Sequence, residues 1–278
     1  MIDDEFNLPQ VLDNIGFMRR LGTLIAPQTT ANMPLYETAQ KMLGWGEIED
    51  VARSGKMDGK KRFVGKDWIK NQRSHGSCNG FAEAMAAARA RVARGLARID
   101  LSGAYAYSLM NGGRDNGSSL ADGRIKVAEM GVCTEALVGW DQIYRNRYDT
   151  AKADAEAARF KGFEVFAAGT KEGWYSGLAQ GFIGVAAVHV NRAFMNVNSA
   201  GVAGVDNGPG NHSIGVEGLI WDGGLVETAW NHWDVTYGVE GRMNLLWDHH
   251  QQTFGYHEHY LFRAMIDDPQ GDNPPILK

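Results

Sequence analysis

Apolar residues near the start of the chain recur three or four positions apart, from Leu8 to Met18. This spacing matches the turn of a helix and predicts an amphipathic helix that ends near Gly22. A second stretch with the same period predicts another helix over roughly 36 to 53. Because connector-like sequences surround both stretches, residues 1–60 are predicted to form an N-terminal helical arm outside the main core.

Two further helices are predicted in the middle of the chain. The run CNGFAEAMAAARARV, residues 78–92, is rich in Ala, Met, Glu and Arg, which favour helices. Asn79 and Gly80 are unfavourable inside a helix, so we expect the helix to begin there, with Cys78 at its N-terminus. The run SLADGRIKVAEM predicts a second helix over 119–130.

The second half of the chain changes character. Short β-rich runs, separated by Gly, Asn and Asp, predict strands at 183–190, 212–220, 224–230, 242–247 and 260–264. Helices followed by strands are typical of an α+β fold, in which a helical layer packs against an antiparallel sheet or barrel.

Composition narrows the class of protein. The 278 residues are 44% hydrophobic and contain no apolar run long enough to span a bilayer, and the start of the chain is acidic, unlike a secretory signal. The net charge of −5 argues against a nucleic-acid binder. We interpret the one basic run, RARVARGLAR at 89–98, as the solvated face of a helix. No nucleic-acid or membrane partner is therefore expected.

The chain has only two cysteines, Cys78 and Cys133. They exclude a disulfide framework, although one bridge between them stays open as an alternative. A reducing compartment is the simpler interpretation. We expect a cytoplasmic or virion-associated protein.

A thiol at a helix N-terminus is a candidate nucleophile, because the helix dipole favours the thiolate. It needs a base, and His212 follows a flexible Gly/Asn stretch and opens a strand, a position that suits a catalytic base. His189 lies inside an apolar strand, which is typical of a core or sheet-face residue, and the role of His75 is open. A lone cysteine in a helix is more often a small apolar residue than a nucleophile.

The late histidines, at positions 249, 250, 257 and 259, suggest a metal site. They lack a cysteine partner and the HExxH spacing of zinc enzymes, so neither a metal nor another cofactor is predicted. Asn231, which follows a predicted strand, is the natural group to orient the ring of His212. The Gln72 amide and the Cys78 backbone N–H are candidate oxyanion donors.

The combination resembles the papain-like cysteine peptidases, in a bacterial or phage-type branch without the usual disulfides. NQRSHGSCNGFA is similar to the family's NQGxxGSCWAFA, and the histidine and asparagine lie 134 and 153 residues after Cys78. Four more segments follow in the family's order, over about 65 to 250: LSGAYAY, DNGSSLADGRIKVAEMGVCTEALVGW, NHSIGVEGL and WNHWDVTYGVEGRMNLL.

The resemblance implies a two-lobed molecule, with Cys78 on a helical lobe and His212 and Asn231 on an antiparallel β-barrel lobe. The active site then lies in the cleft between the lobes, and Trp233 covers the His–Asn hydrogen bond. The residues that the resemblance implies along the substrate cleft are Asn116, Gly117, Ser118, Asn211 and Trp233.

The chain also departs from the family pattern. Asn79 stands where the family has a tryptophan after the nucleophile, and His75 where it has a disulfide cysteine. Asp234 and Tyr237 replace a glycine and a tryptophan of the last motif. The resemblance therefore implies the chemistry of the family with an altered wall beside the sulfur.

Two functions are compatible with these observations. The first is a peptidase domain over 61–265 that hydrolyses peptides or proteins through Cys78, His212, Asn231 and Gln72. The second is a structural or assembly component, for instance of a virus particle, that keeps the fold. In either case the arm and a tail at 266–278 are candidate docking segments for protein partners or further copies of the chain.

Overall fold

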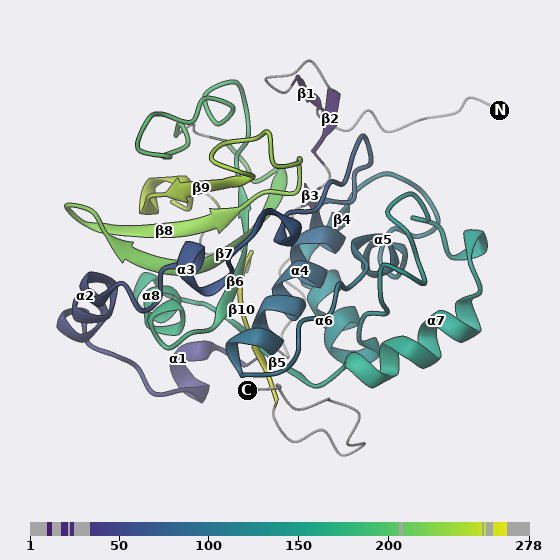
Figure 1. Cartoon of the computed structure of the whole chain (residues 1–278), viewed down its shortest axis with the longest axis horizontal. Coiled ribbons are helices and arrows are strands. Elements are labelled where there is room, and N and C mark those ends of the chain that lie inside the picture. The colour runs from purple at the N-terminus through teal and green to yellow at the C-terminus, as the bar shows by residue number, and fades with distance from the viewer. Residues whose placement is uncertain are drawn as a thin grey trace.

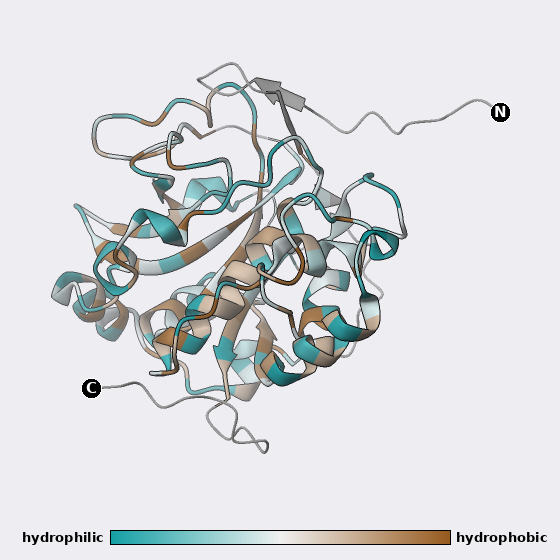
Figure 2. Ribbon diagram, turned by 45° about the vertical axis from the view of Figure 1, so that its right-hand side comes forward, coloured by the Kyte–Doolittle hydropathy of each residue, from teal (hydrophilic) through white to brown (hydrophobic). Residues whose placement is uncertain are grey.

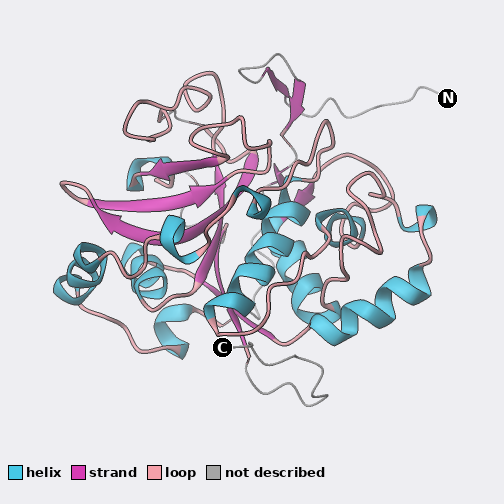
Figure 3. Ribbon diagram, viewed as in Figure 1, coloured by secondary structure: helices cyan, strands magenta, loops and turns pink. Residues whose placement is uncertain are grey.

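The structure is a computed structural model that describes residues 10–12, 18–21, 23–24, 34–205, 208–251, 253 and 258–265. The predicted tail and His257 lie outside these residues. Figure 1 shows helix α4 (Cys78–Ala93) in the middle of the molecule, with the large sheet on one side of it and helices α5 to α7 on the other. The predicted α+β class is confirmed, and Figure 3 shows the large sheet, with several helices beside it, on one side of α4 and further helices on the other.

Helix α4 begins at Cys78, as predicted, and every residue from Cys78 to Arg91 is buried. Its small alanine side chains let neighbouring elements approach from all sides. Position 80 requires glycine because α5 packs closely against it. A Cβ there would lie 2.5 Å from the carbonyl oxygen of Gly103 at the start of α5. The interpretation of the basic run as a solvated face is wrong for Arg89 and Arg91, which are buried inside the molecule, whereas Arg94 is exposed.

The remaining helices are mostly short and surround α4 and the sheet. Their bounds are α1 Tyr36–Ala39, α2 Trp45–Ser54, α3 Gly59–Arg62, α5 Gly103–Ser108, α6 Leu120–Met130, α7 Thr150–Ala157 and α8 Lys171–Ala179. Short 3-10 helices cover Lys66–Trp68, Arg145–Arg147, Ala158–Phe160 and Trp247–His249. Helix α6 confirms the prediction for 119–130, and the Ser119 hydroxyl caps its N-terminus by accepting from the Ala121 N–H at 3.1 Å. None of the helices in the described part of the chain is both long and apolar enough to cross a bilayer.

Six strands form an antiparallel sheet in the order β5-β10-β6-β7-β8-β9. Their bounds are β5 Phe163–Ala167, β6 Ile183–Val188, β7 His212–Trp221, β8 Leu225–Trp230, β9 Arg242–Leu245 and β10 His259–Ala264. All five predicted strands are present, and β5 is additional. The predicted closed barrel is wrong, because the sheet is open. Strands β5 and β9 are its two edges, and no ladder among the described residues joins them.

Strand β6 shows that the sheet is covered on both faces. Its residues Ile183 and Val185 belong to the core that the sheet shares with α4. The alternate residues Ala186 and Val188 belong to a second core that includes Trp174 of α8. Side chains alternate between the two faces of a strand, so α8 and α4 lie on opposite faces of the sheet. Figure 2 shows the hydrophobic residues gathered in the middle of the molecule, where these layers meet.

The N-terminal region differs from the prediction. Strands β1 (Gln10–Leu12) and β2 (Met18–Arg20) pair antiparallel where one helix was predicted. The prediction of a helical arm is therefore wrong for these residues. Few apolar positions supported that helix, and the sequence includes Pro9 and Gly16, which are poor helix formers. Strand β3 (Thr23–Leu24) then pairs in parallel with β4 (Ser118–Ser119) of the helical lobe.

The helix predicted over 36 to 53 is divided into α1 and α2. Gln40 is in an extended conformation at the end of α1, and Gly44 caps α2, where its N–H donates to the Glu47 carboxylate at 2.8 Å. Tyr36 and Ile48 are buried in the core on the α8 side of the sheet. This part of the chain therefore contributes to the packing of the sheet.

A buried ion triad joins α4 to the sheet. The Glu217 carboxylate on β7 accepts from Nε of Arg89 and from Nε of Arg242, both at 2.7 Å. The Arg89 guanidinium lies 3.9 Å from the ring centroid of Trp230, and burial lowers its pKa to about 10. Removing the charge of Glu217 would leave two buried guanidinium groups without a counter-charge.

We expect Glu217→Gln to lower the free energy of unfolding by about 3–5 kcal/mol, because it leaves buried positive charges without a counter-charge. Urea titration followed by circular dichroism measures it. The control is Glu164→Gln, which breaks the partly exposed pair with Arg263 at 2.6 Å and should cost less than about 1 kcal/mol. Equal small losses in both variants would contradict this role for the triad.

Candidate active site

Cys78 is the first residue of α4, and its side chain is fully buried. The backbone N–H groups of the first helical turn point toward the N-terminal end of the helix, where they favour a thiolate over a thiol. Cys133, the only other cysteine, is also a buried free thiol, so the two are not bridged. Burial raises the pKa of the Cys133 thiol to about 12, which makes it a poor nucleophile.

His212 and Asn231 come from neighbouring strands, at the start of β7 and just after the end of β8. Nε2 of His212 lies 2.9 Å from Oδ1 of Asn231, close enough for a hydrogen bond. The indole of Trp233 stacks on the imidazole, with 4.4 Å between ring centroids and 30° between planes. The ring of His212 is thus fixed in orientation, and both Trp233 and Asn231 are fully buried.

The hydrogen bond decides which nitrogen of His212 can exchange a proton. If Nε2 donates its hydrogen to Asn231, the lone pair is on Nδ1. Within the described residues, Nδ1 of His212 is buried and has no hydrogen-bond partner. It is therefore the atom that can act as a base.

Thr23 of β3 connects the two halves of the site. Its backbone N–H donates to the carbonyl oxygen of Asn211, the residue before His212, at 3.2 Å. Its hydroxyl oxygen lies 3.4 Å from Sγ of Cys78. One residue thus contacts both the sulfur and the segment that leads into the histidine strand. No sequence motif marked Thr23, and only the fold brings it to the site.

Asn79 holds Thr23 in this place. Its Oδ1 accepts from the Thr23 hydroxyl at 2.9 Å, and its Nδ2 donates to the carbonyl oxygen of Ser118 at 2.5 Å. Strand β3 runs beside Ser118 and Ser119 in parallel register. The asparagine that departs from the family pattern therefore joins helix α4, the predicted substrate segment and strand β3.

Gln72 is fully buried in the loop before α4. Its Nε2 donates to the carbonyl oxygen of His75 at 2.8 Å, and its backbone N–H donates to the carbonyl oxygen of His232 at 2.9 Å. The second contact ties the loop before Cys78 to the segment that carries Asn231.

The predicted substrate residues occupy two segments. Asn116 is half-buried, and Gly117 has a positive φ of 77° and donates its N–H to the Tyr107 hydroxyl at 3.0 Å. Ser118 begins β4. Asn211 holds its side chain against the backbone of Val190 by two hydrogen bonds, which leaves its carbonyl oxygen to Thr23. The structure thus brings Ser118 and Asn211 to the two sides of β3.

His75, at the position of the family's disulfide cysteine, has a partner in Asp115. Nδ1 of His75 lies 3.3 Å from the Asp115 carboxylate, which also accepts from the Gly76 N–H at 2.8 Å and from the Tyr107 hydroxyl at 3.0 Å. Burial alone would raise the pKa of Asp115, but these hydrogen bonds bring it below the ordinary value. These contacts thus tie the loop before Cys78 to the predicted substrate loop. An acidic residue just before Asn116 was the available signal in the sequence.

Three of the late histidines, His249, His250 and His259, are buried in the core. His250 lies between the Glu227 carboxylate and Nε2 of His259, at 2.8 Å from each, and all three side chains are buried. Trp174 donates its indole N–H to the same carboxylate at 2.9 Å. Searching the described ranges finds no group of three metal-ligating side chains. His189, half-buried after β6, contacts the carbonyl oxygen of Pro209 at 2.8 Å.

The environment of His212 predicts a pH-dependent stability. Burial lowers its pKa to about 4, although the hydrogen bond to Asn231 acts in the opposite direction. The unfolded chain therefore binds more protons than the folded chain between about pH 6.5 and 4, and stability falls as the pH decreases through this range. At pH 5 this one group costs about 2 kcal/mol.

We expect the loss of unfolding free energy between pH 7.5 and pH 5 to be smaller by about 2 kcal/mol in His212→Gln than in the parent chain. Urea titrations at both pH values measure it. Burial also lowers the pKa values of His249 and His259, but both histidines are present in both proteins. Identical pH dependences would contradict the buried, neutral state of His212.

The fold and the site define a class: the chain has the fold of papain-like cysteine proteases. It is similar to xylellain, a cysteine protease from Xylella fastidiosa, with a TM-score of 0.68 and 16% identity over 92% of this chain and 98% of that one. It is also similar to stem bromelain precursor (TM-score 0.64, 16% identity, 88% of this chain and 77% of that one). A third similar structure is procathepsin L 3 of Tenebrio molitor larval midgut, with a TM-score of 0.62 and 15% identity over 88% of this chain and 76% of that one.

No protein-family model matches the sequence, and neither does any curated protein sequence. The similarity is therefore one of structure, and at 15–16% identity it shows the fold. The resemblance that the sequence motifs indicated is confirmed at this level.

Proposed function

We propose that the chain is a cysteine peptidase that hydrolyses peptide bonds through Cys78, His212 and Asn231, with Gln72 as an oxyanion donor. The observation that carries the proposal is the state of His212. Its Nε2 is held by Asn231 under the indole of Trp233, while its Nδ1 is left for another group. The nucleophile helix packs against the strand that carries this imidazole.

In the proposed reaction, Nδ1 of His212 takes the proton of the thiol, and the sulfur attacks the carbonyl carbon of the peptide. The oxyanion that forms accepts from the Cys78 backbone N–H and the Gln72 amide. The imidazolium gives its proton to the leaving amine, and an acyl-enzyme thioester remains. Water, deprotonated by the same imidazole, then releases the carboxylic acid and restores the thiol.

The position of β3 supports a place for an extended substrate. Its backbone pairs with Ser118 and Ser119 and donates to Asn211, as a peptide in the cleft could do. We propose that substrate takes this place and that the N-terminal strand must leave first. In the state described here Thr23 covers the sulfur, so the intact chain is expected to be nearly inactive.

In a variant whose N-terminal strand is released, replacing Gln72 by alanine is expected to lower kcat about 10²-fold with little change in KM, because the lost amide acts on the oxyanion of the transition state. Steady-state kinetics with a fluorogenic peptide measure both constants. Gln142→Ala, which removes an amide remote from the site in the helical lobe, is the control. A rise in KM with unchanged kcat would assign Gln72 to substrate binding.

The proposal is tested with the full chain and with the variant Leu21→Asp, which is designed to release the N-terminal strand. Each is incubated with peptides of random sequence, and products are identified by mass spectrometry. We expect cleavage that disappears when Cys78→Ala is added. Cleavage that survives Cys78→Ala, or no cleavage by any form of the protein, would contradict the proposal and leave the assembly role.

A further inference from the structure

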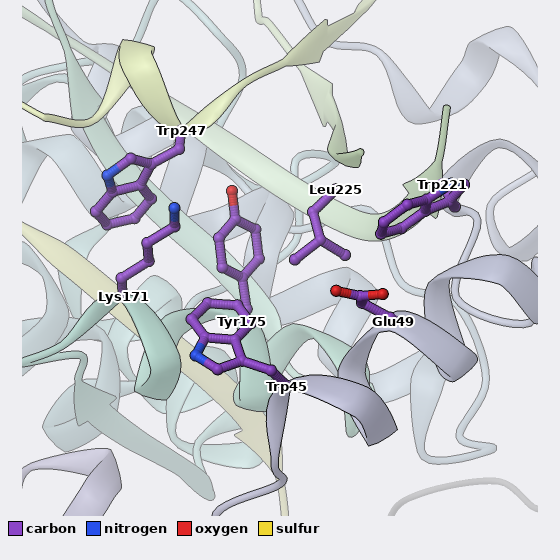
Figure 4. Close-up of a pocket in the computed structure, with 7 residues that line it drawn as sticks. All are labelled: Trp45, Glu49, Lys171, Tyr175, Trp221, Leu225 and Trp247. Carbon is purple, nitrogen blue, oxygen red and sulfur yellow. The ribbon is translucent and has the colours of Figure 1, made fainter. Parts of the chain in front are cut away.

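A pocket of about 330 Å³ lies on the face of the sheet that α8 covers, opposite the face that packs against α4 and its nucleophile. Helix α2 supplies Trp45 and Glu49 to it, and helix α8 supplies Lys171 and Tyr175. Figure 4 shows these side chains converging from separate elements on a shared space. The pocket is thus separate from the candidate active site.

Three indole rings surround the pocket, those of Trp45, Trp221 and Trp247. Trp45 is 38% exposed, and the other two are half-buried. The ring of Tyr175 lies 6.0 Å from Trp45 at 59° and 5.8 Å from Trp247 at 49°, so the rings form a corner instead of stacking on one another. Large aromatic side chains gathered at a surface pocket are typical of a binding site.

An ammonium group stands at one side of this corner. Nζ of Lys171 lies 5.0 Å from the ring centroid of Trp247, 5.8 Å from that of Trp45 and 5.9 Å from that of Tyr175. The three rings hold the cation in place. Among the described residues, no carboxylate lies within ion-pair distance of Lys171. The pocket therefore offers a fixed positive charge to an anionic ligand.

Glu49 stands at the other side of Tyr175 from Lys171 (Figure 4). It is paired with Arg53 at 3.3 Å, and the Arg53 guanidinium covers Trp221 at 3.5 Å from the ring centroid. This side of the pocket thus provides both hydrogen-bond acceptors and donors, fixed beside an indole. An ion pair of this kind suits neutral hydroxyl groups better than a second ligand charge.

From these features we propose that the pocket binds a pyranose sugar that carries a carboxylate, as in an acidic polysaccharide. The C–H face of a pyranose packs on indole rings, its carboxylate meets Lys171, and its hydroxyls meet the ion pair of Glu49 and Arg53. A peptide strand has less to bind, because Trp221 and Leu225 at this edge are already paired with each other in the β7–β8 hairpin. The proposal does not depend on peptide hydrolysis.

The test titrates the full chain with trigalacturonate and, as the matched uncharged sugar, its methyl ester, followed by calorimetry and tryptophan fluorescence. We expect saturable binding of trigalacturonate. The ester should bind at least about fivefold more weakly. Trp45→Ala should abolish the binding, and Lys171→Gln should remove the preference for the acid. Trp140→Ala, which removes another exposed indole of the chain, is the control and should change neither.

Sodium acetate and an acetylated tri-aspartate peptide test the anion without the sugar ring. Neither should bind detectably at the concentration that saturates the pocket with trigalacturonate. The proposal is overturned if trigalacturonate does not bind, if Trp45→Ala binds it as well as the parent chain, or if the acidic peptide binds equally well at this pocket.

Discussion

The double variant Leu21→Asp and Thr23→Ala is expected to hydrolyse peptides on the order of 10²-fold faster than the parent chain. Leu21 is buried in the core on the α8 side of the sheet, and burying a leucine side chain stabilises the closed arrangement by about 2 kcal/mol. Thr23→Ala removes the hydroxyl that donates to Asn79, which adds about 1 kcal/mol, and keeps the backbone N–H that donates to Asn211. Together the two losses correspond to a factor of roughly 10² in the equilibrium between the closed and the open cleft.

The rate is measured with a fluorogenic peptide at equal concentrations of active thiol. Val64→Asp places the same charge at a side chain that is 74% exposed, so it is the control for a general effect of the substitution. Equal rates for the parent and the double variant would show that β3 does not restrict the cleft. If Val64→Asp increased the rate as much as the double variant, the increase would also not be due to the release of β3.

We call the double variant Leu21→Asp and Thr23→Ala the released variant. Replacing His212 by alanine in it is expected to lower kcat/KM by about 10²–10⁴-fold, the usual contribution of a general base, with the loss mainly in kcat. In the proposed mechanism the same imidazole both removes the proton of the thiol and supplies the proton to the leaving amine. Asn231 orients the ring through the contact of 2.9 Å, so Asn231→Ala should fall between the parent and His212→Ala.

His189→Ala is the matched control, because this half-buried histidine follows the neighbouring strand β6 and contacts Pro209 instead of the site. It should retain the activity of the released variant. A loss of less than tenfold in His212→Ala would contradict a role for this imidazole in proton transfer.

Much of the fold could be predicted from the sequence where one period dominated. The alanine-rich run after Cys78 and the apolar runs that became β6 and β7 are long or strongly β-forming, and each is found close to its predicted bounds. The basic run in α4 led to a wrong prediction, because charged side chains are normally exposed to solvent. Arg89 is instead neutralised inside the protein by Glu217, 128 positions later in the chain, which no local pattern reveals.

The N-terminal region was predicted wrongly for the same reason. Helical spacing between Leu8 and Met18 could not show that the chain pairs with itself as β1 and β2 or that Thr23 reaches Ser118. Those pairings join segments distant in sequence. The open sheet, in place of the expected barrel, also depends on which strands remain unpaired, and this is decided by the complete topology.

At the candidate site, the spacing of motifs predicted the pairing of His212 with Asn231 and the covering indole of Trp233, all of which lie together. The roles of the departures could not be predicted. Asn79 replaces an indole but bridges Thr23 and Ser118, and His75 replaces a cysteine but contacts Asp115. In both cases the new side chain has a partner that only the folded chain brings near.

The central claim is that the sulfur of Cys78 and the imidazole of His212 work as a pair. The most direct measurement treats the released variant with a peptidyl epoxide and follows modification by mass spectrometry, with Cys133 as the internal control thiol. We expect modification of Cys78 alone, slowed by at least about 10²-fold in His212→Ala. Modification of Cys78 at the same rate without His212, or no modification of Cys78, would contradict it.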